Sequence, residues 1–209
     1  VDSEPVWTVA ERELFATWGV VFTPAMKAAM VGSRMDASVR MMIDFGGGAA
    51  ANSTVKQVSA FLTERMAELF RAQLPVLPGV LELLGAAVDA GVPQALVSST
   101  HRALVDAVLR GLPGHPFAVS VAGDEVRHGK PHPEPYETAA ARLGVDPRRC
   151  VVLEDTPTGA RAGAAAGARV VYCPSVIGAG EAEPGWLPVS SLADVSLADL
   201  GALLSARSG

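Results

Sequence analysis

The stretch Cys150-Val151-Val152-Leu153-Glu154-Asp155-Thr156-Pro157-Thr158-Gly159 decides the fold. Its four apolar residues do not alternate with polar ones, which is typical of a strand covered on both faces of a parallel sheet. A proline and a glycine then end the strand and start a helix. Glu154 and Asp155 therefore lie at the carboxyl edge of a sheet, where open α/β sheets bind their ligands.

Two adjacent carboxylates at such an edge suit a hard divalent cation such as Mg²⁺. The alternative is a surface turn with two solvated acids, which the positive end of the following helix would favour. The pair by itself leaves both interpretations open, so the neighbouring loops decide between them.

Beyond Pro75 the chain alternates between strands and helices. Strands are predicted at 94–98, 117–121, 150–154, 168–172 and 187–189, and helices at 79–90, 102–110, 133–143, 158–166 and 193–204. This alternation indicates α/β architecture, with a Rossmann-like parallel sheet and helices on both faces. Residues 6–74 show only helical periodicity, and 46–51 are predicted to be a flexible linker. We expect a core domain from 1–5 and 75–209 and an all-helical cap domain from 6–74.

Composition narrows the class of protein. The 209 residues are 49% hydrophobic and carry a formal net charge of -5. No basic run occurs and no apolar stretch could cross a bilayer, so we expect neither a nucleic-acid nor a membrane partner. The first residues are acidic and polar, unlike a signal peptide, and Cys150 and Cys173 end apolar runs. Buried free thiols and a cytoplasmic location are expected.

Two further predicted strand ends carry groups suited to phosphate. Ser98 and Ser99 follow one strand directly, and hydroxyls and N–H groups at a helix start bind anions. Lys130 lies between Gly129 and Pro131 and is one of three lysines among 17 basic residues. Its ammonium could neutralise a phosphate as a point charge. Helix capping by the serines and a simple exposed lysine are the alternatives. On successive loops of one sheet edge, these groups and the carboxylate pair together predict a magnesium-assisted phosphate site.

With these residues the chain resembles the haloacid-dehalogenase superfamily, in particular its β-phosphoglucomutase-like phosphatases with a helical cap. Val97-Ser98-Ser99 resembles the second family motif, Gly129-Lys130-Pro131 the third, and Leu153-Glu154-Asp155 the fourth. Gly32-Ser33-Arg34 is similar to a substrate-facing cap loop. The resemblance implies a set of site residues: catalytic Lys130 and Ser98, phosphate-binding Ser98, Ser99, Lys130 and Arg34, and Mg²⁺ ligands Asp155 and Glu154. Glu154 could instead support the metal ligands, and Arg34 is equally compatible with a solvated arginine.

The first family motif, which carries the nucleophilic aspartate and the general acid/base, does not occur in the printed residues. Val1-Asp2-Ser3-Glu4-Pro5 is similar to the segment that follows it. In the family this motif forms the central strand, between those that end here at Ser98 and Glu154. Its absence would leave two interior edges unpaired. We therefore expect roughly ten or more residues upstream, about one strand and a turn, and residues 1–209 alone to be inactive.

The resemblance predicts a magnesium-dependent phosphatase that hydrolyses a small phosphomonoester, such as a sugar phosphate, through an aspartyl phosphate. We expect a monomer or weak homodimer. A β-phosphoglucomutase-like sugar phosphomutase is the alternative, although Trp7 stands near a position where mutases often carry histidine. A catalytically dead relative that binds phosphate ligands is a third.

The four histidines suggest no catalytic arrangement. His128 and His132 are four residues apart, but the Gly-Lys-Pro sequence between them excludes a regular helix. We therefore expect no zinc-binding pair there.

Overall fold

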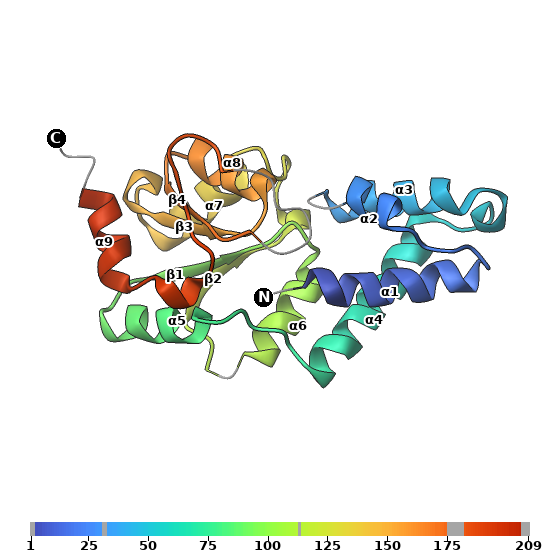
Figure 1. Cartoon of the computed structure of the whole chain (residues 1–209), viewed down its shortest axis with the longest axis horizontal. Helices are drawn as coiled ribbons and strands as arrows, with labels where there is room; N and C mark the ends of the chain where they lie inside the picture. The colour runs from blue at the N-terminus through green and yellow to red at the C-terminus, as the bar shows by residue number, and fades with distance from the viewer. Residues whose placement is uncertain (1–2, 31–32, 113, 175–181, 206–209) are drawn as a thin grey trace.

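The computed structural model describes residues 3–30, 33–112, 114–174 and 182–205, which form a helical half and a half that contains the strands (Figure 1). The helical half consists of α1 (Glu4–Thr17), α2 (Pro24–Met30), α3 (Met35–Gly46) and α4 (Val55–Ala72). Their apolar faces meet in one cluster in which Phe15, Leu62 and Met66 are fully buried. Burial of these large side chains is the main force that holds the short helices together.

The helix starts follow local sequence signals. Thr54 caps α4, because its hydroxyl accepts the N–H of Gln57 at 3.3 Å while the Gln57 side chain accepts the Thr54 N–H at 3.0 Å. The helix α1 begins at Glu4 and has Pro5 in its first turn, where proline fits because its missing N–H would have no partner in the helix. Val1 and Asp2 lie outside the described residues.

The predicted flexible linker at 46–51 is wrong. Gly47–Ala50 forms the 3₁₀ helix η1, and Ala50 is fully buried. A Cβ added at Gly46 would lie 2.6 Å from the Ala50 Cβ and 2.9 Å from the Trp18 ring. This glycine therefore permits close packing rather than flexibility.

The second half contains five strands and the helices that cover them. The strands are β1 (Gln94–Val97), β2 (Phe117–Val121), β3 (Val151–Glu154), β4 (Arg169–Tyr172) and β5 (Trp186–Pro188). The helices are α5 (Val80–Asp89), α6 (Arg102–Gly111), α7 (Glu134–Leu143), α8 (Pro157–Ala165) and α9 (Leu197–Ser205). Every strand pairing between described strands is parallel, and Figure 1 shows α7 and α8 above the strands, α5 and α6 below them and α9 at their left-hand end. The α/β class with helices on both faces is confirmed.

The described strands form two sheets instead of one continuous sheet, in the orders β1-β2 and β3-β4-β5. The strands β1 and β3 line the same cavity of about 970 Å³, with Leu96 and Val97 on one side and Val151 and Leu153 on the other. No strand among the described residues pairs with β1 or β3 on this side. The lining includes apolar residues of both strands, such as Leu96 and Val151, and polar residues that follow the strands, such as Ser98 and Asp155.

The predicted division at residues 74 and 75 stays a prediction. One apolar cluster contains Phe70 of α4 together with Leu104 and Val108 of α6, so it crosses that boundary. The two halves therefore share part of their hydrophobic core.

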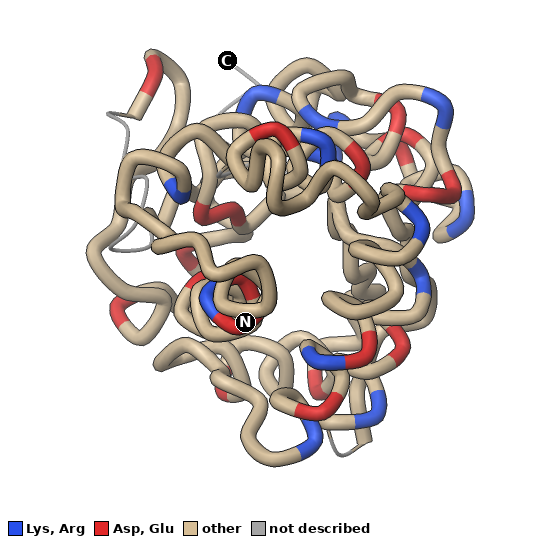
Figure 2. Tube along the Cα trace, turned by 90° about the vertical axis from the view of Figure 1, so that its right-hand side faces the viewer, with Lys and Arg blue, Asp and Glu red and all other residues tan. Residues whose placement is uncertain are grey.

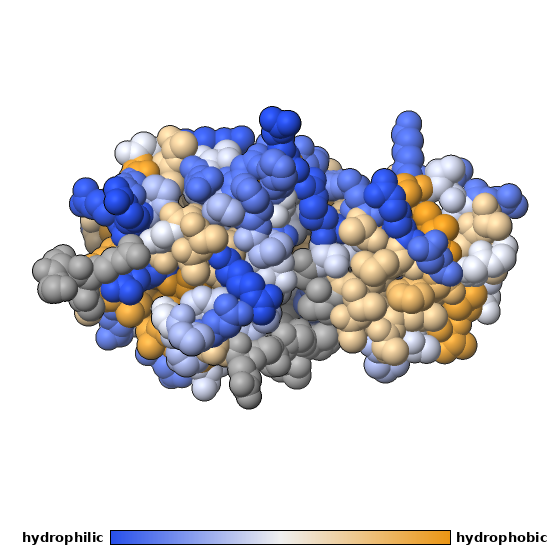
Figure 3. Space-filling model, turned by 90° about the horizontal axis from the view of Figure 1, so that it is seen from above, coloured by the Kyte–Doolittle hydropathy of each residue, from blue (hydrophilic) through white to orange (hydrophobic). Residues whose placement is uncertain are grey.

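The surface carries no single dominant charge. In a view from the helical end, acidic and basic residues are interspersed around the trace (Figure 2). Seen from above, apolar colours gather over the helical half and more polar colours over the other half (Figure 3). Both cysteines are free, Cys173 buried and Cys150 half-buried. Within the described ranges, no helix has the length and hydropathy of a membrane span.

Candidate active site

Ser98, Lys130 and Asp155 border the same cavity. Ser98 follows β1, Asp155 follows β3, and Lys130 lies on the loop that leads into α7. Ser99 lines the cavity as well. The structure thus brings together the three chain segments that the sequence placed on one sheet edge.

Glu154 is the centre of this polar end. Its Oε1 atom accepts from Lys130 Nζ and from the Tyr136 hydroxyl. Its Oε2 atom accepts from the N–H groups of Asp155 and Thr156, at 3.2 and 3.4 Å, and from the Thr156 hydroxyl at 3.2 Å. Both carboxylate oxygens are therefore engaged, which leaves Glu154 poorly suited to ligate a cation directly.

The Lys130–Glu154 ion pair is buried, with side chains only 8% and 7% exposed. Burial by itself would raise the pKa of Glu154, but the charge of Lys130 and the surrounding hydrogen bonds outweigh it and lower that pKa. Burial, and then the adjacent Glu154 charge, raise the pKa of Tyr136 well above its usual value. Tyr136 therefore remains a neutral hydrogen-bond donor to an ionised Glu154.

Two contacts besides Glu154 fix the Lys130 ammonium. Nζ donates to the Val97 carbonyl at 3.2 Å and lies 4.9 Å from the centre of the Tyr136 ring. The first contact joins the end of β1 to the loop before α7, and the second is a cation–π contact. Lys130 is consequently held in place before any ligand binds.

Gly159 makes room for the Glu154 side chain. A Cβ at Gly159 would lie 2.1 to 2.2 Å from the Glu154 carboxyl group. The Thr156 hydroxyl accepts the Gly159 N–H at 3.1 Å and so caps α8 over the same carboxylate. The glycine seen in the sequence as a helix-start signal is thus also a packing requirement.

Asp155 differs from its neighbour because no other described residue donates a hydrogen bond to its carboxylate. Burial and the adjacent Glu154 charge raise the pKa of Asp155 to about 6. A nearby cation would relieve both effects, and a carboxylate oxygen is a ligand that Mg²⁺ prefers. The hydroxyl of Thr100, which lines the same cavity, is also buried and has no hydrogen-bond partner among the described residues. Asp155 therefore fits a magnesium ligand.

Some hydrogen-bonding groups of the loop after β1 are already used within the protein. The Ser98 hydroxyl accepts the Thr100 N–H at 3.2 Å but keeps its proton for donation to a ligand. The Arg102 N–H at the start of α6 is bonded to Asp124 Oδ1 at 2.8 Å. The Asp124 carboxylate therefore already binds one of the N–H groups at this helix start, which the sequence had suggested for anion binding.

Arg34 does not line the cavity. Its guanidinium donates to the backbone carbonyls of Gly123 at 2.9 Å and Arg127 at 3.3 Å. Arg34 therefore links the helical half to the loops near Lys130, and contact with a substrate stays a prediction. Ser33 lines the cavity, whereas Gly32 lies outside the described residues.

Sequence reasoning missed Tyr136 and Thr156 as residues of the site. Thr156 carried a usable signal, because a threonine directly before Pro157 is a typical helix cap. Tyr136 carried none, since its contact with Glu154 joins residues that are 18 positions apart.

A parallel α/β fold with a serine, a lysine and an acidic pair at its strand ends defines a class of phosphate-processing enzymes. The family model described as haloacid dehalogenase-like hydrolase matches residues 1–167. The chain belongs to this hydrolase family.

Particular relatives refine the comparison. Hexitol phosphatase B of Escherichia coli (strain K12) is 32% identical over 208 residues, which cover 96% of this chain and 87% of that protein. Protein CbbY of Rhodobacter capsulatus is 36% identical over 134 residues, which cover 62% of this chain and 59% of CbbY. A crystal structure of a CbbY variant from Rhodobacter sphaeroides in complex with xylulose-1,5-bisphosphate superimposes with a TM-score of 0.87 at 28% identity, covering 96% of this chain and 93% of the other.

Proposed function

We propose that the protein is a magnesium-dependent phosphatase that hydrolyses a small phosphomonoester, such as a sugar phosphate. The observation that carries the proposal is the shared cavity of Ser98, Lys130 and Asp155. The names of hexitol phosphatase B and of the CbbY complex with a sugar bisphosphate support this substrate class.

In this proposal each side chain has one task. Lys130 balances the negative charge of the phosphoryl group, and its existing contacts mean that it needs little reorganisation. The Ser98 hydroxyl donates a hydrogen bond to a phosphoryl oxygen. Asp155 ligates Mg²⁺, which would neutralise charge on the transferred group when bound. Glu154 acts through Lys130 and is a positioning residue rather than a metal ligand.

The nucleophile is proposed to be an aspartate on a strand that fills the cavity between β1 and β3, so that the reaction passes through an aspartyl phosphate. Neither of the two described carboxylates of this site is available as the nucleophile. Glu154 already accepts hydrogen bonds through both oxygens, and Asp155 is proposed to ligate Mg²⁺. A strand in the cavity would pair with the free edges of both sheets and cover the apolar side chains of Leu96 and Val151.

The test is hydrolysis of an aryl phosphate and a panel of sugar phosphates by protein that includes any residues its gene encodes before Val1. We expect activity to disappear with EDTA and to return with Mg²⁺. We expect Lys130→Met to lower kcat by roughly 100-fold or more, because one preorganised donor to a developing charge has about that effect.

Activity that is indifferent to the chelator and to Lys130→Met would contradict the proposal. Transfer of phosphate between positions of one sugar, with little free phosphate released, would identify a phosphomutase instead. Thermal stabilisation of the same protein by phosphate, without turnover, would identify a ligand-binding relative.

A further inference from the structure

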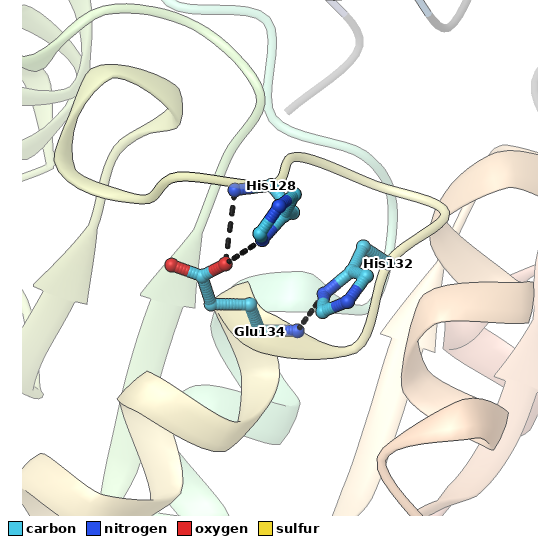
Figure 4. Close-up of side chains that lie close together, drawn as sticks. All are labelled: His128, His132 and Glu134. Carbon is cyan, nitrogen blue, oxygen red and sulfur yellow. Dashed lines mark hydrogen bonds and ion pairs between the residues drawn. The ribbon is translucent and has the colours of Figure 1, made fainter.

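His128, His132 and Glu134 form a cluster on the loop before α7, outside the lining of the cavity (Figure 4). One nitrogen from each imidazole and one carboxylate oxygen lie within 4.8 Å of one another. The two ring centres are 4.6 Å apart. The expectation of no zinc-binding pair at this place rested on helical spacing alone. The turn through Gly129, Lys130 and Pro131 nevertheless brings the two rings close together.

The cluster is oriented by specific contacts. His128 Nδ1 and Glu134 Oε2 are 2.8 Å apart. In the tautomer with its hydrogen on Nδ1, this N–H donates to the carboxylate and the lone pair lies on Nε2. A carboxylate that binds the second nitrogen of a histidine in this way orients metal-ligating imidazoles and raises their basicity. Figure 4 shows both histidine rings on the same side of the loop, facing each other above Glu134.

Glu134 and the two prolines preorganise the loop. The Glu134 carboxylate also accepts the N–H groups of Arg127 and His128, at 2.8 and 2.9 Å. Pro131 and Pro133 restrict the backbone on either side of His132. The His132 Nδ1 atom accepts only a 3.2 Å contact from the Glu134 N–H, which it can exchange for a stronger ligand. Little conformational entropy is then lost when the imidazoles bind a common ion.

We propose that His128 and His132 bind a divalent transition metal such as Zn²⁺, Ni²⁺ or Co²⁺, with Glu134 as the residue that orients His128. Imidazole nitrogen suits these ions, whereas Mg²⁺ prefers the oxygen ligands offered by Asp155. The His128 side chain is 61% exposed, so water can complete the coordination shell. The two ligands flank Lys130 at two residues on either side. An ion held between them joins both ends of the segment that carries this lysine.

The experiment titrates the protein with Co²⁺ in excess Mg²⁺ and follows the visible absorption of nitrogen-ligated cobalt. The wild type should bind Co²⁺ saturably, and Zn²⁺ should displace it. His128→Ala and His132→Ala should each weaken binding by at least about tenfold, and Glu134→Gln by about tenfold, the lower end of the usual cost of losing an orienting partner. The matched control His115→Ala removes an exposed histidine elsewhere and should bind as the wild type does.

Cobalt absorption is measured without turnover, so the result tests metal binding independently of the proposed phosphatase activity. Asp155→Asn should leave the cobalt spectrum unchanged, which locates the ion away from the magnesium ligand. Thermal unfolding of each variant checks the fold, and both histidines are exposed. Absence of saturable Co²⁺ binding by the wild type would overturn the proposal. Binding as tight as that of the wild type by either folded histidine variant would overturn it too.

Discussion

The Glu154 carboxylate is the acceptor for several groups of the site. It accepts hydrogen bonds from the Lys130 ammonium, the Tyr136 hydroxyl and the first backbone N–H groups of the turn into α8. In a buried ion pair, the attraction between the two charges offsets the cost of removing both from water. Removal of one partner leaves the other charge buried without this compensation. The polar end of the cavity therefore depends on the pair as a unit.

Lys130→Met is expected to lower the free energy of unfolding by about 3–5 kcal/mol, because it leaves the Glu154 charge buried without its partner. Lys130→Met combined with Glu154→Gln removes both charges and should recover a large part of that loss. Urea unfolding of the wild type, both single variants and the double variant measures the coupling. Strictly additive losses would show that the two residues do not act as a unit.

Gly159→Ala is expected to destabilise the protein by about 1–3 kcal/mol, because the added methyl group overlaps the buried Glu154 carboxyl group. Gly85→Ala is the matched control: Gly85 is exposed within α5, and an added Cβ there would meet no atom within 4 Å beyond its neighbours and the backbone of its own helix. It should be neutral or stabilise the protein by up to about 1 kcal/mol through helix propensity. Equal effects of the two substitutions in thermal unfolding would argue against the packing role of Gly159.

At the scale of elements, a polar network joins α6, α7 and the end of β2. Arg102 of α6 contacts Glu125 Oε2 at 2.7 Å and the Ser120 hydroxyl at 2.8 Å. Arg142 of α7 donates to the Ser120 carbonyl at 2.7 Å and lies 3.3 Å from the same Glu125 oxygen. Three elements from separate parts of the chain are thus linked through one carboxylate.

Hydrogen bonds from Arg102, and secondly from the Ala122 N–H, lower the pKa of Glu125 from 4.5 to about 2. The folded pKa is depressed, so this stabilisation is fully present above about pH 4.5 and is lost as the pH falls toward about 2. Glu125→Gln should remove about 1–2 kcal/mol at neutral pH and little at the acid end of that range. Unfolding by urea at a series of pH values measures this, with Glu137→Gln, an exposed site on α7, as the control. A loss that is independent of pH would contradict the assignment.

At the scale of the whole molecule, the helical half contacts the other half through polar as well as apolar groups. Arg34 bonds to the carbonyls of Gly123 and Arg127, and His101 Nε2 lies 3.4 Å from Asp36 Oδ1. The Gly123–Arg127 segment leads directly into the loop of Lys130. The position of the helical half is therefore coupled to the loop that carries the site.

Arg34→Ala is expected to accelerate hydrogen exchange of the backbone at 123–129 severalfold, because it removes two bonds that hold this segment against the helical half. Arg40→Ala removes an exposed arginine of α3 and should leave the exchange unchanged. Because the lost contacts are partly solvated, global stability should change by less than about 1 kcal/mol. Identical exchange in both variants would show that Arg34 does not restrain the loop.

Much of the fold could be read from local signals. Apolar runs, helical periodicity and turn residues identified the strands, most helices and the positions of Ser98, Lys130, Glu154 and Asp155 at strand ends. These signals are local because hydrogen-bond geometry and side-chain burial impose a period on a few consecutive residues. The linker at 46–51 was misjudged because burial of Ala50 by distant residues overrode the glycine-rich composition.

The amino-acid sequence by itself determined the order of elements and which chemical groups reach the edge of the sheet. Only the tertiary structure decided that Glu154 holds Lys130 with Tyr136, that Arg34 bonds to a backbone loop, and that His128 faces His132. Those outcomes depend on distances between segments remote in the chain or on the path of an irregular turn. Neither is encoded in a periodic pattern, because both follow from how the whole core packs.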